Sequence, residues 1–137
     1  MSAVYRRNLM PDTLSKRVID GQTVYTQVVV IEAKRIAFIS GQVPRDKHGN
    51  TVGKGDMAAQ IRQCCENVKA GVEAAGGTLA DLVKTSTFVT DLDEYFKHTK
   101  VRMEYMSQGM PTSTTIQISK LSHPDYMVEI EAIAVIS

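Results

Sequence analysis

Two glutamates near the C-terminus have a spacing that can support chemistry on a β-strand. Glu129 and Glu131 alternate with apolar residues in the segment 127–136, Met-Val-Glu-Ile-Glu-Ala-Ile-Ala-Val-Ile. Successive side chains of a strand point to opposite faces, so both carboxylates share one face while Val128 and Ile130 share the other. Glu129 is a candidate general base that holds or deprotonates an attacking water. The alternative is a solvated or salt-bridged strand carboxylate, and we interpret Glu131 as structural.

Hydroxyl side chains on two other segments are candidate binding groups. Ser40 ends an apolar strand pattern and precedes Gly41, so its hydroxyl and a backbone N–H could meet a substrate oxygen. The alternative for Ser40 is a turn cap, because serine often bonds its own backbone. No G-x-S-x-G sequence makes it the nucleophile of a triad. The row Thr112-Ser113-Thr114-Thr115 either lines a neutral, hydroxyl-rich pocket or reflects the strand propensity of threonine.

The composition predicts one globular domain over residues 1–137. The chain is 43% hydrophobic and 23% charged, and its net charge of +1 creates no strong field for nucleic acid or anionic membrane. No apolar stretch approaches the roughly 20 residues that span a bilayer, and the N-terminus lacks the apolar core of a signal peptide. We therefore expect neither a nucleic-acid nor a membrane partner.

The cysteines and histidines predict neither disulfide nor metal chemistry. Cys64 and Cys65 are adjacent on an apolar helical stripe, where they cannot easily form an unstrained disulfide with each other. We interpret them as buried thiols in a reducing compartment, and expect a cytoplasmic protein. His48, His98 and His123 match no zinc spacing, so we expect no metal.

The hydrophobic rhythm predicts six strands and two helices. Strand patterns occupy residues 4–10, 24–31, 36–40, 82–90, 111–118 and 127–136, with a tight turn at Lys34-Arg35. Helical spacing follows the candidate N-cap Asp56 as far as Gly76, and follows Asp91, with a capping box to Glu94, as far as Gly109. Residues 11–22 and 41–55 have loop composition. The natural arrangement is one mixed sheet with both helices on one face.

This layering leaves the other sheet face uncovered. That face would carry Glu129, Glu131, Ile133 and Val135, together with Thr and Ser side chains of the neighbouring strands. A large, partly apolar sheet face is unfavourable in water. Self-association in a closed ring is the simplest way to cover it, and sites at subunit junctions then become possible.

Four segments resemble the RidA/YjgF family, also described as endoribonuclease L-PSP-like. They are Ser-Gly-Gln-Val-Pro at 40–44, the helix at 60–69 with Ala-Ala-Gly after it, the strand and cap at 81–92, and Glu-Ile-Glu-Ala-Ile-Ala at 129–134. They follow one another in the family's order and nearly with its spacing. The resemblance covers the chain from about residue 22 to the C-terminus.

The resemblance implies a fold, an assembly and an activity. The fold is of the α+β class and chorismate-mutase-like, with a six-stranded sheet backed by two helices. The assembly is a homotrimer with clefts between subunits. The activity is hydrolysis of small enamines and imines, which releases ammonia and a keto acid without a metal or organic cofactor.

The family's site residues carry over one by one. The aromatic ring of its N-terminal loop matches Tyr25, although two extra residues separate it from Ser40. Its strand-end serine and the adjacent glycine match Ser40 and Gly41. An asparagine often found on the second helix falls at Thr99, and a cysteine often found on the following strand falls at Thr115. The carboxylate that orients water matches Glu129.

Ser113 departs from the pattern of the imine-hydrolysing members. They carry an arginine two residues after the proline, and here Ser113 follows Pro111 at that distance. Arginine grips a carboxylate by two charged hydrogen bonds, whereas serine offers one neutral donor. The loss amounts to about 1.5–3 kcal/mol, or roughly ten- to a hundredfold in affinity. Arg45 or Arg102 is a candidate substitute.

Three functions follow from these residues. The first is an enamine or imine deaminase with altered substrate specificity. The second is a non-catalytic trimer that binds a small molecule on the same scaffold, which the missing arginine favours. The third is a ribonuclease or translation inhibitor, which the near-neutral charge and the absence of a basic groove or a histidine pair disfavour.

Overall fold

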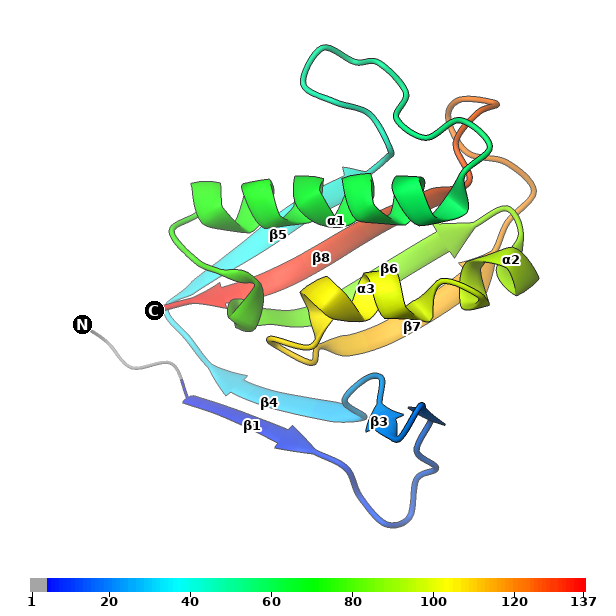
Figure 1. Cartoon of the computed structure of the whole chain (residues 1–137). Coiled ribbons are helices and arrows are strands. Elements are labelled where there is room, and N and C mark those ends of the chain that lie inside the picture. Colours follow the sequence, from blue (N-terminus) through cyan, green and yellow to red (C-terminus); the bar gives the residue numbers. More distant parts are fainter. Residues whose placement is uncertain (1–4) are drawn as a thin grey trace.

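A four-stranded sheet forms the centre of the molecule. The computed structural model describes residues 5–137 (Figure 1). The sheet order is β5-β8-β6-β7, with bounds Arg35–Gln42, Val128–Ile136, Leu82–Val89 and Thr112–Gln117. β6 and β7 run parallel, while β8 is antiparallel to both β5 and β6. The expected α+β class and mixed sheet are confirmed.

The helices cover one face of this sheet, as expected (Figure 1). They are α1 (Met57–Ala74), the 3₁₀ turn η1 (Leu79–Asp81), α2 (Leu92–Phe96) and α3 (Thr99–Met106). The predicted second helix is thus two short helices, which His98 separates with a non-helical φ of −119°. The Thr99 hydroxyl donates to the carbonyl of Phe96 at 3.1 Å across this break. Within residues 5–137, no helix has the length and apolar character needed to cross a membrane.

Local sequence signals fix the ends of these helices. Asp56 caps α1 by accepting from the Ala59 N–H at 3.1 Å, and Gly76 follows the helix with a φ of +90°. Asp91 caps α2 by accepting from the Glu94 N–H at 3.0 Å. The carboxylate of Glu94 does not complete the predicted capping box, because it pairs with the side chains of Lys97 and His98.

The core lies between the helices and β8. The α1 stripe that the sequence predicts is buried, and so are the β8 residues that alternate with Glu129 and Glu131; the chief members are Met57, Ile61, Cys64, Cys65, Val68, Val72, Val128, Ile130, Ala132 and Ala134. Cys64 and Cys65 are free thiols, and burial raises the pKa of both, that of Cys65 to about 12. Their interpretation as core residues is confirmed.

The six long strands do not form one continuous sheet. β1 (Tyr5–Leu9) and β4 (Val28–Glu32) pair antiparallel as a separate ribbon. β4 is joined to β5 through residues 33–34, so the two strands predicted around this tight turn are present, but they pair with different partners and form no hairpin. The predicted loop at 11–22 contains β2 (Val18–Ile19), which pairs with β3 (Gln22–Thr23) across a turn where Asp20 and Gly21 have positive φ.

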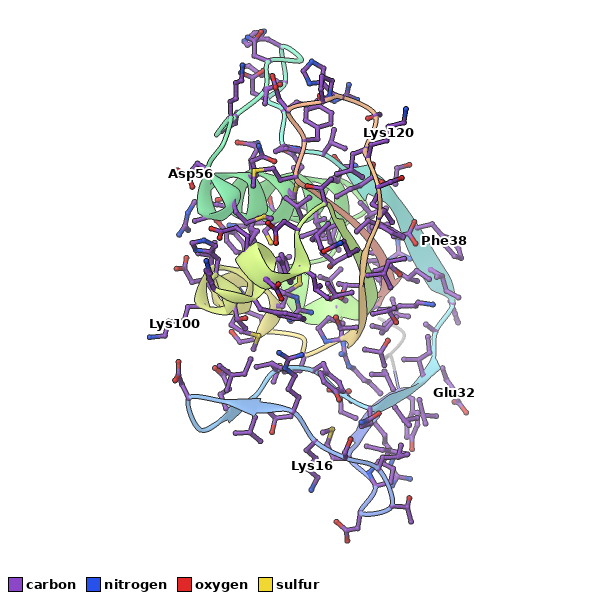
Figure 2. All side chains as sticks on the ribbon, turned by 90° about the vertical axis from the view of Figure 1, so that its right-hand side faces the viewer. Lys16, Glu32, Phe38, Asp56, Lys100 and Lys120 are labelled. Atoms are coloured by element: carbon purple, nitrogen blue, oxygen red, sulfur yellow. The ribbon has the colours of Figure 1, made fainter. Side chains whose placement is uncertain are left out.

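The sheet face opposite the helices is open. Phe38 projects from β5 away from the helices (Figure 2) and is 76% exposed, and Ile36 is 51% exposed. Glu129 is half-buried and Glu131 exposed on this face. Val135 pairs with Ile36 and shares its face as expected, but it is buried there. The predicted layering is therefore present, and the part of the chain that the structure describes, residues 5–137, leaves an apolar surface uncovered.

Candidate functional site

A cavity of about 250 Å³ lies between β7 and the α2–α3 segment. Ser113 and Thr115 of β7 line one side, and Thr99 of α3 lines the other. Tyr25, from the N-terminal segment, also lines the cavity. Four of the seven predicted site residues, distant in sequence, thus meet around one space.

Two hydrogen bonds fix the segment that carries Tyr25. The Thr26 N–H donates to the carbonyl of Pro111 at 3.3 Å, which ties the segment to the start of β7. On the other side of Tyr25, the carbonyl of Val24 accepts from Nη1 of Arg102 at 3.2 Å. Tyr25 is therefore held over the cavity by tertiary contacts rather than by a strand. This explains why the strand predicted for 24–31 begins only at Val28.

Arg102 is a buried charged group of the cavity wall. Its side chain is 5% exposed, and Nη2 donates to the hydroxyl of Thr85 at 3.3 Å. Thr85 pairs with Ser113 in the parallel β6–β7 ladder, so the guanidinium lies beside the position from which residue 113 projects. Of the two candidate substitutes for the missing arginine, the structure brings Arg102 to the cavity. Arg45 is exposed in the loop before α1 and does not line it.

An aromatic corner completes the wall. Tyr95 and Phe96 of α2 pack edge to face at 5.6 Å, and the guanidinium of Arg17 lies 4.2 Å from the Phe96 ring centroid. The hydroxyls of Tyr95 and Thr87 are buried without a hydrogen-bond partner within residues 5–137. Burial raises the pKa of Tyr95, and the charge of Arg102 together with the nearby hydroxyls of Thr87 and Thr115 offsets part of this effect.

The cavity is cationic rather than neutral. Its lining contains two arginines and, within residues 5–137, no acidic side chain. The prediction of a hydroxyl-rich pocket therefore holds for Ser113 and Thr115 but misses the charge. In the sequence, Tyr95 and Phe96 belong to the apolar stripe of the second predicted helix, and Arg17 belongs to a short basic pair typical of a solvated surface. Helical spacing predicts which residues are buried, but it does not identify which side chains line a cavity. The sequence therefore gives no direct signal that Tyr95, Phe96 and Arg17 belong to the site.

The three remaining predicted residues lie elsewhere in the chain. Gly41 is in contact with Glu129, because a Cβ built on Gly41 would lie 2.8 Å from Cδ of that glutamate. Ser40 lines a hollow of about 200 Å³ on the open sheet face, beside Glu131. Ser40 is exposed, and its side chain makes no hydrogen bond within residues 5–137, so the alternative of a turn cap is not supported.

Glu129 and Ser113 point to opposite faces of the sheet. Glu129 pairs with Phe88 across β6 and β8, while Ser113 pairs with Thr85 across β6 and β7. Residues 85 and 88 differ by an odd number, so their side chains lie on opposite faces. One chain therefore does not bring its candidate base to its own cavity. Within residues 5–137, no group of three or more His, Cys, Asp or Glu side chains could hold a metal ion.

Comparisons with known proteins agree on a single family. The profile described as Endoribonuclease L-PSP matches residues 16–136. A RutC family protein of Pyrococcus horikoshii is 38% identical over 104 residues, which is 76% of this chain and 82% of the relative.

Two crystal structures have the same fold. YyfB from Yersinia pestis, a conserved Rid family protein of unknown function, matches with a TM-score of 0.83 and 27% identity over 96% of this chain and 98% of that one. TdcF of E. coli with bound serine matches with a TM-score of 0.68 and 29% identity over 96% and 100%. The chain therefore belongs to the endoribonuclease L-PSP family, that of the RutC and RidA/YjgF proteins.

Proposed function

We propose that this protein hydrolyses small enamines or imines derived from amino acids, releasing ammonia, with a substrate preference altered by Ser113. The observation that carries the proposal is the meeting of Tyr25, Thr99, Ser113 and Thr115 around one cavity. The volume of about 250 Å³ is below the usual range for drug-sized ligands and suits a molecule of amino-acid size. The serine bound in the related TdcF is a ligand of that size.

Glu129 is the base in this proposal. It takes a proton from a water that attacks the imine carbon, and a C–O bond forms while the electrons of the C=N bond move to nitrogen. Proton transfer to nitrogen then lets the C–N bond break, so imine and water give a carbonyl compound and ammonia. A positioned general base contributes about 10²–10⁴-fold to such a step. The hydroxyls of Ser40, Ser113 and Thr115 are donors for substrate oxygens.

The reaction requires a second copy of the chain. Glu129 and Ser113 lie on opposite faces of one sheet, so a site that contains both draws them from different subunits. The exposed Phe38 and Ile36 supply an apolar surface for such an association. We propose a homotrimer with clefts between subunits. We further propose a reducing, cytoplasmic location, which the two free cysteines support.

The test is ammonia release from freshly generated imino acids. Native protein is compared with Glu129→Gln and with Glu131→Gln, a matched change on the same strand face. We expect Glu129→Gln to lower the rate by about 10²-fold or more and Glu131→Gln to retain it. Equal rates for native protein and Glu129→Gln would refute the role of Glu129 as base.

A non-catalytic binding protein is the second candidate. Glu129 lies on the sheet face opposite the cavity, so the cavity of one chain can take a ligand without that carboxylate. This placement favours a binding protein. Ligand binding in the cavity with no turnover across a panel of imines would support this function and exclude the first.

A further inference from the structure

The guanidinium of Arg102 is buried and has no acidic partner among residues 5–137. Its side chain is 5% exposed, and the ion pairs within residues 5–137 do not include it. Its partners there are the carbonyl of Val24 at 3.2 Å, the hydroxyl of Thr85 at 3.3 Å and the sulfur of Met103 at 3.5 Å. A buried charge without a countercharge is strongly unfavourable, so such a residue is usually kept for a purpose other than stability.

The bonding of Arg102 leaves donors unused. A guanidinium has five N–H groups. Two of the three contacts involve Nη1 and one involves Nη2, which leaves Nε–H and one Nη2–H without a partner within residues 5–137. Two N–H groups of one fork are what a carboxylate takes in a bidentate pair.

A second buried polar group borders the same cavity. The Tyr95 side chain is 2% exposed, and its hydroxyl has no hydrogen-bond partner within residues 5–137. Tyr95 comes from α2 and Arg102 from α3, and both line the cavity. The Tyr95 hydroxyl has almost no accessible surface and lies near the hydroxyls of Thr87 and Thr115, which leaves Arg102 as the candidate donor for a ligand in the cavity.

The rest of the wall indicates what kind of anion fits. No acidic side chain of residues 5–137 lines the cavity, so its field attracts a negative charge. Val24, Tyr25 and Phe96 supply apolar and aromatic surface next to the donors. An organic carboxylate uses both kinds of wall, whereas an inorganic anion uses only the donors.

We propose that Arg102 on α3 binds the carboxylate of a small 2-imino or 2-oxo acid in this cavity. The proposal rests on the proposed function and deepens it, since it names the residue that anchors the substrate's carboxylate in the same site.

The experiment measures binding of 2-oxobutyrate to the full-length protein by calorimetry. Arg102→Met should weaken binding by about 10- to 100-fold. Arg62→Met is the matched control, because Arg62 lies on α1, pairs with Glu104 and does not line the cavity. The neutral amide of the same acid should bind far more weakly than the acid. Inorganic phosphate should compete poorly.

A double variant guards against simple misfolding. Arg102→Met combined with Ser113→Arg places a guanidinium at the neighbouring position of the same cavity, and we expect it to regain at least part of the lost affinity. Absence of 2-oxobutyrate binding by native protein, or native affinity in Arg102→Met, would overturn the proposal. Equal binding of phosphate would reduce the site to a general anion site and would also overturn it.

Binding and turnover separate this proposal from the proposed function. If Arg102→Met weakens binding while native protein releases no ammonia from imines, the carboxylate site stands and the deaminase function fails. If native protein hydrolyses imino acids and Arg102→Met keeps the same kcat/KM, the deaminase function stands and the role of Arg102 fails.

Discussion

Gly41 controls the position of the Glu129 carboxylate. A Cβ at residue 41 would lie 2.8 Å from Cδ and 3.1 Å from Cγ and Oε1 of Glu129. Ordinary van der Waals contact begins at 3.4 Å, so Gly41→Ala must displace the carboxylate by about 0.6 Å. A misplacement of about 1 Å in an active site can cost 10²-fold in rate. We therefore expect Gly41→Ala to lower kcat for imine hydrolysis by about 10- to 100-fold.

The same change should have little effect on stability. The φ of Gly41 is not among the positive values in the chain, so alanine fits the backbone. The crowded group is the end of a flexible side chain, and replacing glycine stabilises a compatible site by about 0.4–1 kcal/mol through the unfolded state. Urea denaturation should give a free energy of unfolding within about 1 kcal/mol of native.

A double-mutant cycle tests whether Gly41→Ala lowers kcat through the Glu129 carboxylate. In the Glu129→Gln background the base is already lost, so Gly41→Ala should lower the ammonia release rate much less than it does in native protein. Gly71→Ala is the matched control, because its added Cβ would crowd Ile39 at 3.1 Å, away from Glu129. An unchanged kcat in Gly41→Ala would refute the argument. So would an equal factor of decrease in the ammonia release rate in the native and Glu129→Gln backgrounds.

Three further changes test other parts of the account. Ser113→Arg should raise activity toward simple imino acids by adding a cation to the cavity wall, as measured by ammonia release; no gain would mean that the site has diverged further. Cys64 and Cys65 should resist iodoacetamide at pH 8.5 in native protein and react in urea, because burial raises the pKa of both thiols. Rapid labelling of the native protein, measured by mass spectrometry, would contradict the burial of these thiols. Above about pH 9 the thiols ionise only in the unfolded chain, so the free energy of unfolding should fall as pH rises. Phe38→Lys should keep the fold but weaken self-association in sedimentation velocity, since Phe38 is 76% exposed on the open face; unchanged sedimentation would contradict the use of that face.

The sequence predicts the parts of the fold that periodicity reports. The α1 stripe and the alternation of β8 follow from which positions are buried, and both are found as expected. Asp56 and Gly76 mark the ends of α1 because capping depends on a few adjacent residues. Local chemistry therefore accounts for the central sheet and its main helix.

Tertiary contacts decide what the sequence does not predict. Val24 and Thr26 belong to a Val-rich segment with strand rhythm, yet bonds to Arg102 and Pro111 hold them out of a strand. The second helix breaks near His98, where the pattern runs on without a glycine or proline. Arg102 sits on a helix next to apolar Met103, and only the packing of α3 over β6 brings its guanidinium to the cavity.

Subunit mixing tests the central claim most directly, namely that Glu129 and the cavity work together from different copies. Glu129→Gln removes the base, and Ser113→Phe fills the cavity of the other parent. Each parent should be inactive. Unfolding and refolding them as an equal mixture should restore about a quarter of native ammonia release, because random trimers pair an intact base with an intact cavity at one junction in four. A mixture as inactive as its parents, in trimers shown to exchange subunits, would contradict a shared site.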